Sequence, residues 1–217
     1  MQPFKEYYTE QTLMNEGFLK NLGTAAIAGT LALTPHSGKS QTPTPPVYSM
    51  NIVSTDPVVN YIEKHEGKRH KVYLDSKGLK HIGIGHRLVS SDIQLFQSLF
   101  RSEVSYPLIS NGSQSLDDES IYKLFEQDLR KCRVVANHRY TKFNTFSDEL
   151  KSALLDSIFR GEVHPRVDQL INASKFTEAS KEYLNDKEYQ EAKSKGSGVA
   201  ARMEENAKNI LHGSIKS

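Results

Sequence analysis

The chain has 217 residues, of which 37% are apolar and 25% are charged. This length and balance predict a soluble globular protein with one domain plus extensions. The net charge of +2 is too small to indicate a nucleic-acid partner. The single cysteine, Cys132, rules out an intramolecular disulfide, and we expect a buried, inert thiol because no catalytic Cys–His motif surrounds it.

Residues 1–36 differ in composition from the rest of the chain. Residues 1–19 carry spaced apolar residues that are consistent with a small amphipathic helix. Residues 22–34 form an uncharged run, which is shorter than the roughly 20 residues of a stable membrane span. Residues 18–34 could still act as a weakly apolar signal-anchor, although the acidic residues before them do not suit a secretory signal. A membrane contact is expected only in that case.

The opening M-Q-P-F-K-E-Y-Y-T-E supports a different interpretation of this segment. It is similar to the short N-terminal peptides that direct internal proteins of T-even-like phages into the prohead. Those peptides are cut after a glutamate, so the resemblance implies cleavage after Glu10 or Glu16 and packaging in a phage head. A tail with no targeting role is the remaining alternative.

Residues 37–49 read S-G-K-S-Q-T-P-T-P-P-V-Y-S. This composition is typical of an extended Pro/Ser/Thr-rich linker that cannot pack a core. We therefore predict that the folded domain covers residues 50–217.

The first part of this domain predicts a helix followed by a β-hairpin. A helix over residues 58–66 should end at Gly67, because a glycine directly after a helical run is a common stop. Residues 72–74 favour a strand, residues 75–78 (Asp-Ser-Lys-Gly) are typical of a turn, and residues 79–85 return as a second strand.

Alternation along the second strand predicts its two faces. Ile82 and Ile84 should share one face, and His81, Gly83 and Gly85 the other. The glycine face would be nearly bare beside His81, so a bulky ligand could approach the backbone there.

The rest of the domain is predicted to be helical. A polar–apolar helical pattern over residues 91–108 is broken by Asn-Gly-Ser at residues 111–113. Asp117 is an N-cap candidate for a long helix that extends to about Asn137. Further helices are expected over residues 147–159, 165–173, 176–184 and 199–211.

The run from Glu66 to His86 has the pattern E-G-x-x-x-x-x-Y-x-D-x-x-G-x-x-x-I-G-I-G-H. It resembles the opening of the phage-type lysozymes, the muramidases of tailed bacteriophages, and especially their T-even members. Two further segments match that family: F-E-Q-D at residues 125–128, and G-V-A-A-R-M-E-E-N-A at residues 198–207, where Met203 replaces an arginine. The resemblance implies an α+β, mostly helical, two-lobed domain. A small β-hairpin lobe and a larger helical lobe would be joined by a long helix, with the substrate cleft between them.

Glycoside cleavage requires a proton donor for the leaving oxygen and a group on the opposite face of the sugar that activates water or attacks. Glu66 is the expected donor, since the end of a helix beneath a lobe interface could desolvate it and keep it protonated. Without the resemblance, Asp75 would be explained as an ordinary turn residue whose side chain bonds the turn backbone. The resemblance makes it the carboxylate that stabilises positive charge and helps to place the water.

His81 departs from the family pattern, which has threonine at that position. An imidazole there could order or deprotonate water, which would leave an inverting enzyme. It could instead attack the anomeric carbon, which would give a covalent intermediate and retention. A histidine that only fills the cleft and reduces activity is the third alternative.

In the family, a histidine at the position of His86 pairs with an aspartate at the position of Asp128. We therefore predict a structural ion pair that links the lobes and a His86 pKa above that of an ordinary histidine. His81 and His86 differ in strand parity, so a shared metal is not expected.

Three other residues are candidates for substrate binding. Phe159 and Arg160 fall where the family lines its cleft with an aromatic and an amide side chain, and Lys77 replaces an acid at the cleft rim. Arg202, which matches the family's C-terminal arginine, is expected to tie helices together. Tyr73 is expected to pack.

These features together predict a monomeric muramidase that hydrolyses the β-1,4 bond between N-acetylmuramic acid and N-acetylglucosamine in bacterial peptidoglycan, without metal or cofactor. Such a bacteriolytic endolysin would be made in the host cytoplasm and act in the periplasm or cell wall, or be carried in the virion. One alternative is a catalytically weakened virion structural or peptidoglycan-binding protein, which would release no reducing ends. The other is a zinc-dependent amidase or peptidase, which a chelator would inactivate.

Overall fold

The computed structural model describes residues 56–75 and 77–213, all of which belong to the compact unit Met50–Ser217. The predictions for residues 1–49 therefore lie outside the described residues. In the described part the fold is α+β and mostly helical, as predicted, with one small antiparallel sheet. No helix in this part is long and apolar enough to cross a membrane.

The first described helix, α2 (Pro57–Glu66), confirms the predicted helix and its stop. The carboxylate of Asp56 caps its start by accepting a hydrogen bond from the Val58 N–H at 2.8 Å. Gly67 ends it with φ 72°, a left-handed value that favours glycine. This stop places Glu66 at the last helical position, directly before the sheet.

The sheet consists of β1 (Arg69–Leu74), β2 (Lys80–Gly83) and β3 (His86–Arg87), in the order β1-β2-β3. Both pairings are antiparallel, with Tyr73 opposite His81 and Ile82 opposite His86. The predicted hairpin is confirmed. The short third strand is an addition that the sequence pattern did not predict.

The second strand ends at Gly83 and not at Gly85, so the predicted bare glycine face is wrong. Gly83 and Gly85 have φ 63° and 69°, and these left-handed values turn the chain into β3. A Cβ on Gly83 would meet the Ile121 side chain at 3.5 Å, and one on Gly85 would meet Glu66. The glycines therefore face other elements, while Ile82 and Ile84 are both buried.

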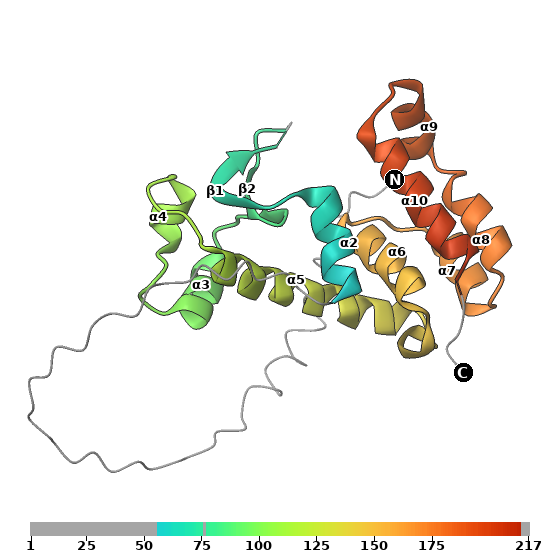
Figure 1. The fold of residues 1–217 in the computed structure, drawn as a ribbon, viewed down its shortest axis with the longest axis horizontal. Helices are drawn as coiled ribbons and strands as arrows, with labels where there is room; N and C mark the ends of the chain where they lie inside the picture. The colour runs from blue at the N-terminus through green and yellow to red at the C-terminus, as the bar shows by residue number, and fades with distance from the viewer. Residues whose placement is uncertain (1–55, 76, 214–217) are drawn as a thin grey trace, which may run out of the picture. The chain divides into compact units, whose positions relative to one another are not determined.

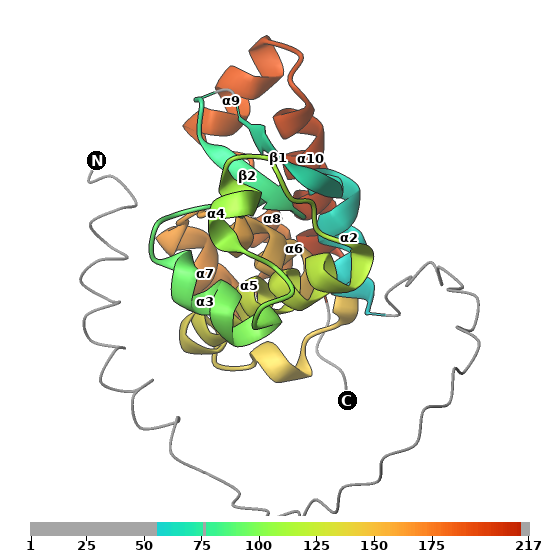
Figure 2. The ribbon, with the colours of Figure 1, turned by 90° about the vertical axis from the view of Figure 1, so that its left-hand side faces the viewer.

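The helical pattern over residues 91–108 corresponds to two helices, α3 (Asp92–Phe100) and α4 (Tyr106–Ser110). The chain breaks between them at Arg101, which has φ 53°. Because α4 ends at Ser110, the predicted break at residues 111–113 is confirmed. Figure 2, seen from the side of α3 and α4, shows the sheet above these two helices.

The predicted long helix is α5 (Asp118–Arg139), with 22 residues. The carboxylate of Asp117 caps it by accepting from the Ser120 N–H at 2.8 Å, as the N-cap prediction required. Its first half lies against the sheet, where Ile121 faces Gly83, and it also packs on α6. Figure 1 shows it running from α3 towards α6. It therefore connects the sheet with the later helices.

Cys132 lies in α5 and is buried, as predicted. Burial, together with the nearby charge of Asp128, raises the pKa of its thiol to about 12. The thiol therefore stays protonated at neutral pH and is a poor nucleophile.

The remaining helices cover the C-terminal half of the chain. Four of them match the predicted ranges to within one residue at each end, whereas α9 was not predicted. Met203, which replaces an arginine of the family signature, is fully buried in the core of this region. The elements are η1 (Phe143–Thr145), α6 (Asp148–Phe159), α7 (Pro165–Asn172), α8 (Phe176–Tyr183), α9 (Lys187–Ser194) and α10 (Gly198–Leu211).

Candidate active site

The backbone of Gly85 is the point at which three candidate residues meet. A Cβ on this glycine would lie 3.0 Å from Glu66 Oε2 and 3.1 Å from Phe159 Cε1. Its carbonyl oxygen lies 3.2 Å from His81 Nδ1. The left-handed turn after β2 thus brings the end of α2, the end of α6 and the middle of β2 together.

Asp75 is held in place by the turn that it begins. Its Oδ1 accepts hydrogen bonds from the Lys77 and Leu79 N–H groups, both at 2.8 Å. Its Oδ2 lies 3.3 Å from His81 Nε2. The Leu79 and Lys77 hydrogen bonds, with the His81 contact, lower the pKa of Asp75. The result is an ionised carboxylate that is fixed before any ligand arrives.

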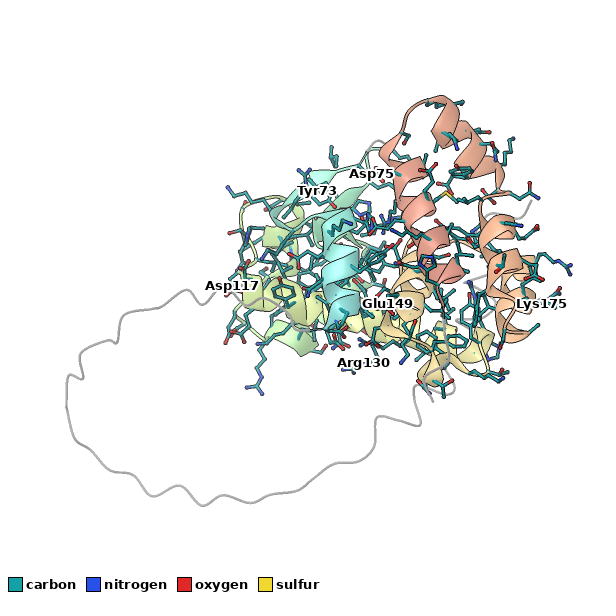
Figure 3. All side chains as sticks on the ribbon, turned by 45° about the vertical axis from the view of Figure 1, so that its right-hand side comes forward. Tyr73, Asp75, Asp117, Arg130, Glu149 and Lys175 are labelled. Atoms are coloured by element: carbon teal, nitrogen blue, oxygen red, sulfur yellow. The ribbon has the colours of Figure 1, made fainter. Side chains whose placement is uncertain are left out.

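Both ring nitrogens of His81 are in contact with oxygen atoms. Because the carbonyl of Gly85 can only accept, Nδ1 carries a proton in that contact. Nε2 faces Asp75 without hydrogen-bond alignment and is shielded from solvent. Tyr73 lies beside the imidazole, with 5.7 Å between the ring centroids, and Figure 3 labels Tyr73 and Asp75 on the hairpin. His81 is therefore packed behind Asp75 and does not project into solvent.

Glu66 is tied to the helical half of the domain through Arg202. Arg202 Nη1 donates to Glu66 Oε1 at 2.6 Å, and its Nε donates to Asp156 Oδ2 at 2.9 Å. Asp156 is fully buried and also accepts from Asn206 Nδ2 at 2.8 Å. Burial would lower the pKa of Arg202, but Asp156 and Glu66 raise it, so the guanidinium stays charged.

The prediction that Arg202 ties helices together is confirmed, since it joins α10 to α6 and α2. Its contact with Glu66 was not predicted. The match of Arg202 to the C-terminal family signature was the only sequence signal near it. That signal gave no indication of a contact with a residue 136 positions earlier.

His86 makes the predicted ion pair with Asp128. Its Nδ1 lies 2.6 Å from Asp128 Oδ2, and its Nε2 lies 3.4 Å from Asp92 Oδ2, a second partner that sequence reasoning missed. Burial lowers the pKa of His86, but Asp128 and Asp92 outweigh it and raise the pKa to about 9. His86 stands opposite Ile82 in the sheet, so it points away from the face that carries His81, as expected.

The three predicted substrate-binding residues have different surroundings. Phe159 borders the site at Gly85 and stacks edge-to-face on Phe125, with 5.7 Å between ring centroids. Arg160 contacts the carboxylate of Glu162 and donates to Glu188 Oε1 at 2.8 Å. These two acids direct Arg160 towards α9, so its contacts lend no support to a role in saccharide binding.

Lys77 lies within the turn that Asp75 begins, and its side chain is exposed. In the described part of the chain no residue forms a hydrogen bond or ion pair with its ammonium group. The position of Lys77 next to Asp75 is compatible with the predicted rim of the site.

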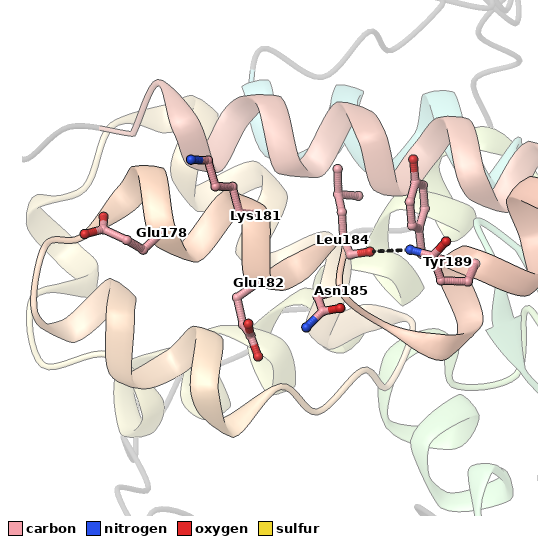
Figure 4. Close-up of a pocket in the computed structure, with 7 residues that line it drawn as sticks. Glu178, Lys181, Glu182, Leu184, Asn185 and Tyr189 are labelled. Atoms are coloured by element: carbon pink, nitrogen blue, oxygen red, sulfur yellow. Dashed lines mark hydrogen bonds between the residues drawn. The ribbon is translucent and has the colours of Figure 1, made fainter.

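A separate pocket of about 520 Å³ lies beside α8 and α9 and contains none of the predicted site residues. Figure 4 shows the side chains that line it and the hydrogen bond from Gln190 to the Leu184 carbonyl, which is 3.1 Å long. It is lined by Glu178, Lys181, Glu182, Leu184, Asn185, Tyr189 and Gln190. The candidate active site is therefore the cluster around Gly85 and not this pocket.

Among residues 56–75 and 77–213, no group of three or more His, Cys, Asp or Glu side chains is arranged to hold a metal ion. No protein-family model matches the chain, and no curated protein matches it. The resemblance to phage-type lysozymes therefore stays a prediction, carried by the motif residues whose positions are now described.

Proposed function

We propose that this protein is a muramidase that hydrolyses the β-1,4 bond between N-acetylmuramic acid and N-acetylglucosamine in bacterial peptidoglycan. The observation that carries the proposal is the meeting of Glu66 and His81 at Gly85, with Asp75 in contact with His81. Two carboxylates beside an aromatic ring provide the acid and the anionic partner that glycoside cleavage needs.

Glu66 acts as the proton donor through Oε2. Its Oε1 is occupied by Arg202 at 2.6 Å, whereas no described residue forms a hydrogen bond with Oε2, which lies against Gly85 and Phe159. A proton on Oε2 can therefore pass to the leaving glycosidic oxygen. Arg202 keeps the carboxyl group in the orientation that this transfer requires.

Asp75 acts on the other side of the scissile bond. It is ionised and preorganised by two backbone N–H groups, so its charge can stabilise the oxocarbenium-like transition state without rearrangement. Its Oδ2 holds the attacking water and accepts a proton from it as the hydroxyl oxygen bonds to the anomeric carbon. The bond to the leaving oxygen breaks at the same time, and that oxygen takes the proton from Glu66.

His81 positions Asp75 in this scheme. Its Nε2 is shielded and its Nδ1 is engaged with Gly85, so the ring would have to leave both contacts before it could attack the anomeric carbon. Water held by Asp75 avoids that rearrangement. We therefore expect inversion of the anomeric configuration and not a covalent intermediate at His81.

The Glu66–Arg202 contact also favours a second candidate, a peptidoglycan-binding protein with weakened catalysis. Only a neutral carboxyl group can donate a proton, and Arg202 is a charged partner for that group. A chain that keeps this ion pair closed would bind the cell wall without cleaving it.

Digestion of purified peptidoglycan by the full chain separates these candidates. Wild type, Glu66→Gln, His81→Thr and the exposed control Glu178→Gln are compared for release of reducing ends and for product anomer by NMR. We expect Glu66→Gln to lose about 10²- to 10⁴-fold in rate, the usual contribution of a general acid, with Glu178→Gln unchanged. Full activity of Glu66→Gln would refute the assignment.

The stereochemical readout tests the role of His81 separately. Inversion by both wild type and His81→Thr supports a positioning role. Retention by the wild type that is lost in His81→Thr would make His81 the nucleophile. Binding to peptidoglycan with no reducing ends released by the wild type would establish the second candidate.

A further inference from the structure

One face of the sheet carries a cross-strand row of side chains that includes His81. Tyr73 stands opposite His81 between β1 and β2, and Arg87 stands opposite His81 between β2 and β3. Directly opposed residues of antiparallel strands project to the same face. His86 points the other way, towards Asp128, so the next residue, Arg87, must project to the face of His81.

Arg69 adds a second guanidinium to this face. Its Cζ lies 4.6 Å from the centroid of the Tyr73 ring, a cation–π contact that holds the side chain over the row. In the sheet Arg69 stands opposite Gly83, which has no side chain that could cover it. Two arginines therefore flank the Tyr73–His81 pair, one on each side.

Neither arginine is neutralised by an acid in the part of the chain that the structure describes. Arg69 and Arg87 are both exposed, and no described carboxylate forms an ion pair with either of them. Glu66 and Asp75 are the carboxylates that act on Tyr73 in this row, and both are already engaged, Glu66 by Arg202 and Asp75 by two backbone N–H groups and His81. By contrast, Arg133 and Arg202 each contact two carboxylates.

The sequence around the sheet also contains more basic than acidic residues. Residues 66–92 include six Lys or Arg residues and three acids, Glu66, Asp75 and Asp92, and of the six bases only Lys68 is paired with described carboxylates, those of Glu63 and Asp118. The sheet and its turns therefore carry more positive than negative charge beside the candidate active site. Such an excess raises the local concentration of anionic ligands.

We propose that Arg69 and Arg87 are specificity-determining residues that bind carboxylates carried by the glycan. The inference rests on the proposed function, and it names a charge specificity of that site: peptidoglycan with free carboxylates in preference to the same glycan with its carboxylates amidated. A guanidinium matches a carboxylate with two parallel hydrogen bonds, which a lysine cannot reproduce. Tyr73 keeps Arg69 ordered before the ligand arrives.

The test compares two forms of one substrate. Peptidoglycan is N-acetylated on its free amines and then used either as it is or after carbodiimide coupling of its carboxylates to methylamine, which removes their charge. The full chain is assayed as wild type, Arg87→Gln, Arg69→Gln and Arg87→Lys. The control is Arg130→Gln, an exposed arginine on α5. Thermal unfolding verifies that each variant is folded.

We expect the wild type to have a higher kcat/KM on the charged substrate than on the amidated one. Arg87→Gln should reduce kcat/KM on the charged substrate by about fivefold at low ionic strength, the upper end for an exposed charge pair, and leave the amidated substrate unaffected. Arg69→Gln should act similarly, Arg87→Lys should restore part of the loss, and Arg130→Gln should change nothing. Raising the salt concentration should reduce the difference between wild type and Arg87→Gln.

Co-sedimentation with the two insoluble substrates makes the result independent of cleavage. If the wild type binds and cleaves both forms equally, or if Arg87→Gln weakens both forms equally, the inference is wrong even where Glu66-dependent hydrolysis is found. If no reducing ends are released but Arg87-dependent binding to the charged form persists, the muramidase proposal fails. Arg69 and Arg87 would then form a carboxylate-binding site without cleavage.

Discussion

Arg202 Nη1 donates a hydrogen bond of 2.6 Å to Glu66 Oε1, and the same guanidinium holds the fully buried carboxylate of Asp156. One side chain of α10 therefore fixes the proposed proton donor and neutralises an acid in the core. The position of Glu66 and the stability of the helical region therefore depend on the same side chain, that of Arg202.

Replacing Arg202 with methionine should destabilise the fold by about 3 kcal/mol, because removal of one partner leaves the Asp156 charge buried without its counter-charge. Urea unfolding at neutral pH measures the change. Arg130→Gln, on the exposed side of α5, should stay within about 0.5 kcal/mol of the wild type. A similarly small change in Arg202→Met would show that Asn206 alone satisfies Asp156.

His86 should make stability depend on pH in the alkaline range. Its pKa is raised from 6.5 to about 9 by Asp128 and Asp92, against the effect of burial. Protonated His86 therefore stabilises the fold fully below about pH 6.5, and this contribution is lost as the pH rises through about 9. The shift corresponds to stabilisation on the order of 3 kcal/mol, since the side chain is only 5% exposed.

Urea unfolding of wild type and His86→Gln at pH 6, 7.5 and 9.5 measures this contribution. The difference between the two proteins should be largest at pH 6 and nearly disappear at pH 9.5. Asp128, whose pKa is lowered by the His86 contact against the effect of its own burial, contributes in the opposite direction and only at acidic pH. A difference that does not vary between pH 6 and 9.5 would contradict the ion pair.

Elements with local signals could be predicted from the sequence. The stop of α2 at Gly67 and the N-cap of α5 at Asp117 each depend on one residue and its immediate neighbours. By contrast, alternation could not predict the end of β2, because only glycine adopts the left-handed values at Gly83 and Gly85 readily and the pattern says nothing of φ. Helix α9 was missed because it buries only Tyr189 and Ala192 among polar residues.

In the candidate site, too, the local arrangement could be predicted from the sequence and the long-range contacts could not. The spacing of Glu66, Asp75 and His81 predicted residues that do cluster, since the hairpin between them is local. The contact of Arg202 with Glu66 depends on the packing of α10 on the rest of the domain, which no local pattern encodes. Asp92 was likewise read only as part of a helical stretch, although its Oδ2 lies 3.4 Å from His86.

Substituting Gly85 with alanine should cause a large loss of activity and only a moderate loss of stability. A methyl group there would lie 3.0 Å from Glu66 Oε2 and 3.1 Å from Phe159, so the proposed donor must move. Gly196→Ala is the matched control, because Gly196 also has a left-handed φ, 61°, but nothing lies within 4 Å of its Cβ position. Both variants should lose about 1–2 kcal/mol from backbone strain, measured by urea unfolding.

Only Gly85→Ala should lose reducing-end release, by about 100-fold or more, since a displacement of about 1 Å at a reacting group has an effect of this size. Equal activity of the two alanine variants would show that Glu66 does not need its place against Gly85.

Asp75→Asn should remove the negative charge of Asp75 and leave the structure of the turn intact. The amide oxygen of asparagine can still accept from the Lys77 and Leu79 N–H groups, so we expect stability within about 0.5 kcal/mol of the wild type. The rate of reducing-end release should fall at least about 100-fold, because the anionic partner of the transition state is lost. Near wild-type activity would remove Asp75 from the mechanism.

The pH dependence of the wild type and His81→Thr then tests whether His81 acts through Asp75. The Leu79 and Lys77 hydrogen bonds and the His81 contact all lower the pKa of Asp75, so the wild type should keep its activity to a pH below the ordinary aspartate value of 3.8. Without the imidazole the acidic limb of kcat/KM should move to higher pH, although not as far as 3.8, because the backbone hydrogen bonds remain. Unfolding followed over the same pH range separates this shift from loss of the fold. A side chain that only fills space would lower the rate at every pH and leave the limb in place, so the position of the limb decides between the two roles.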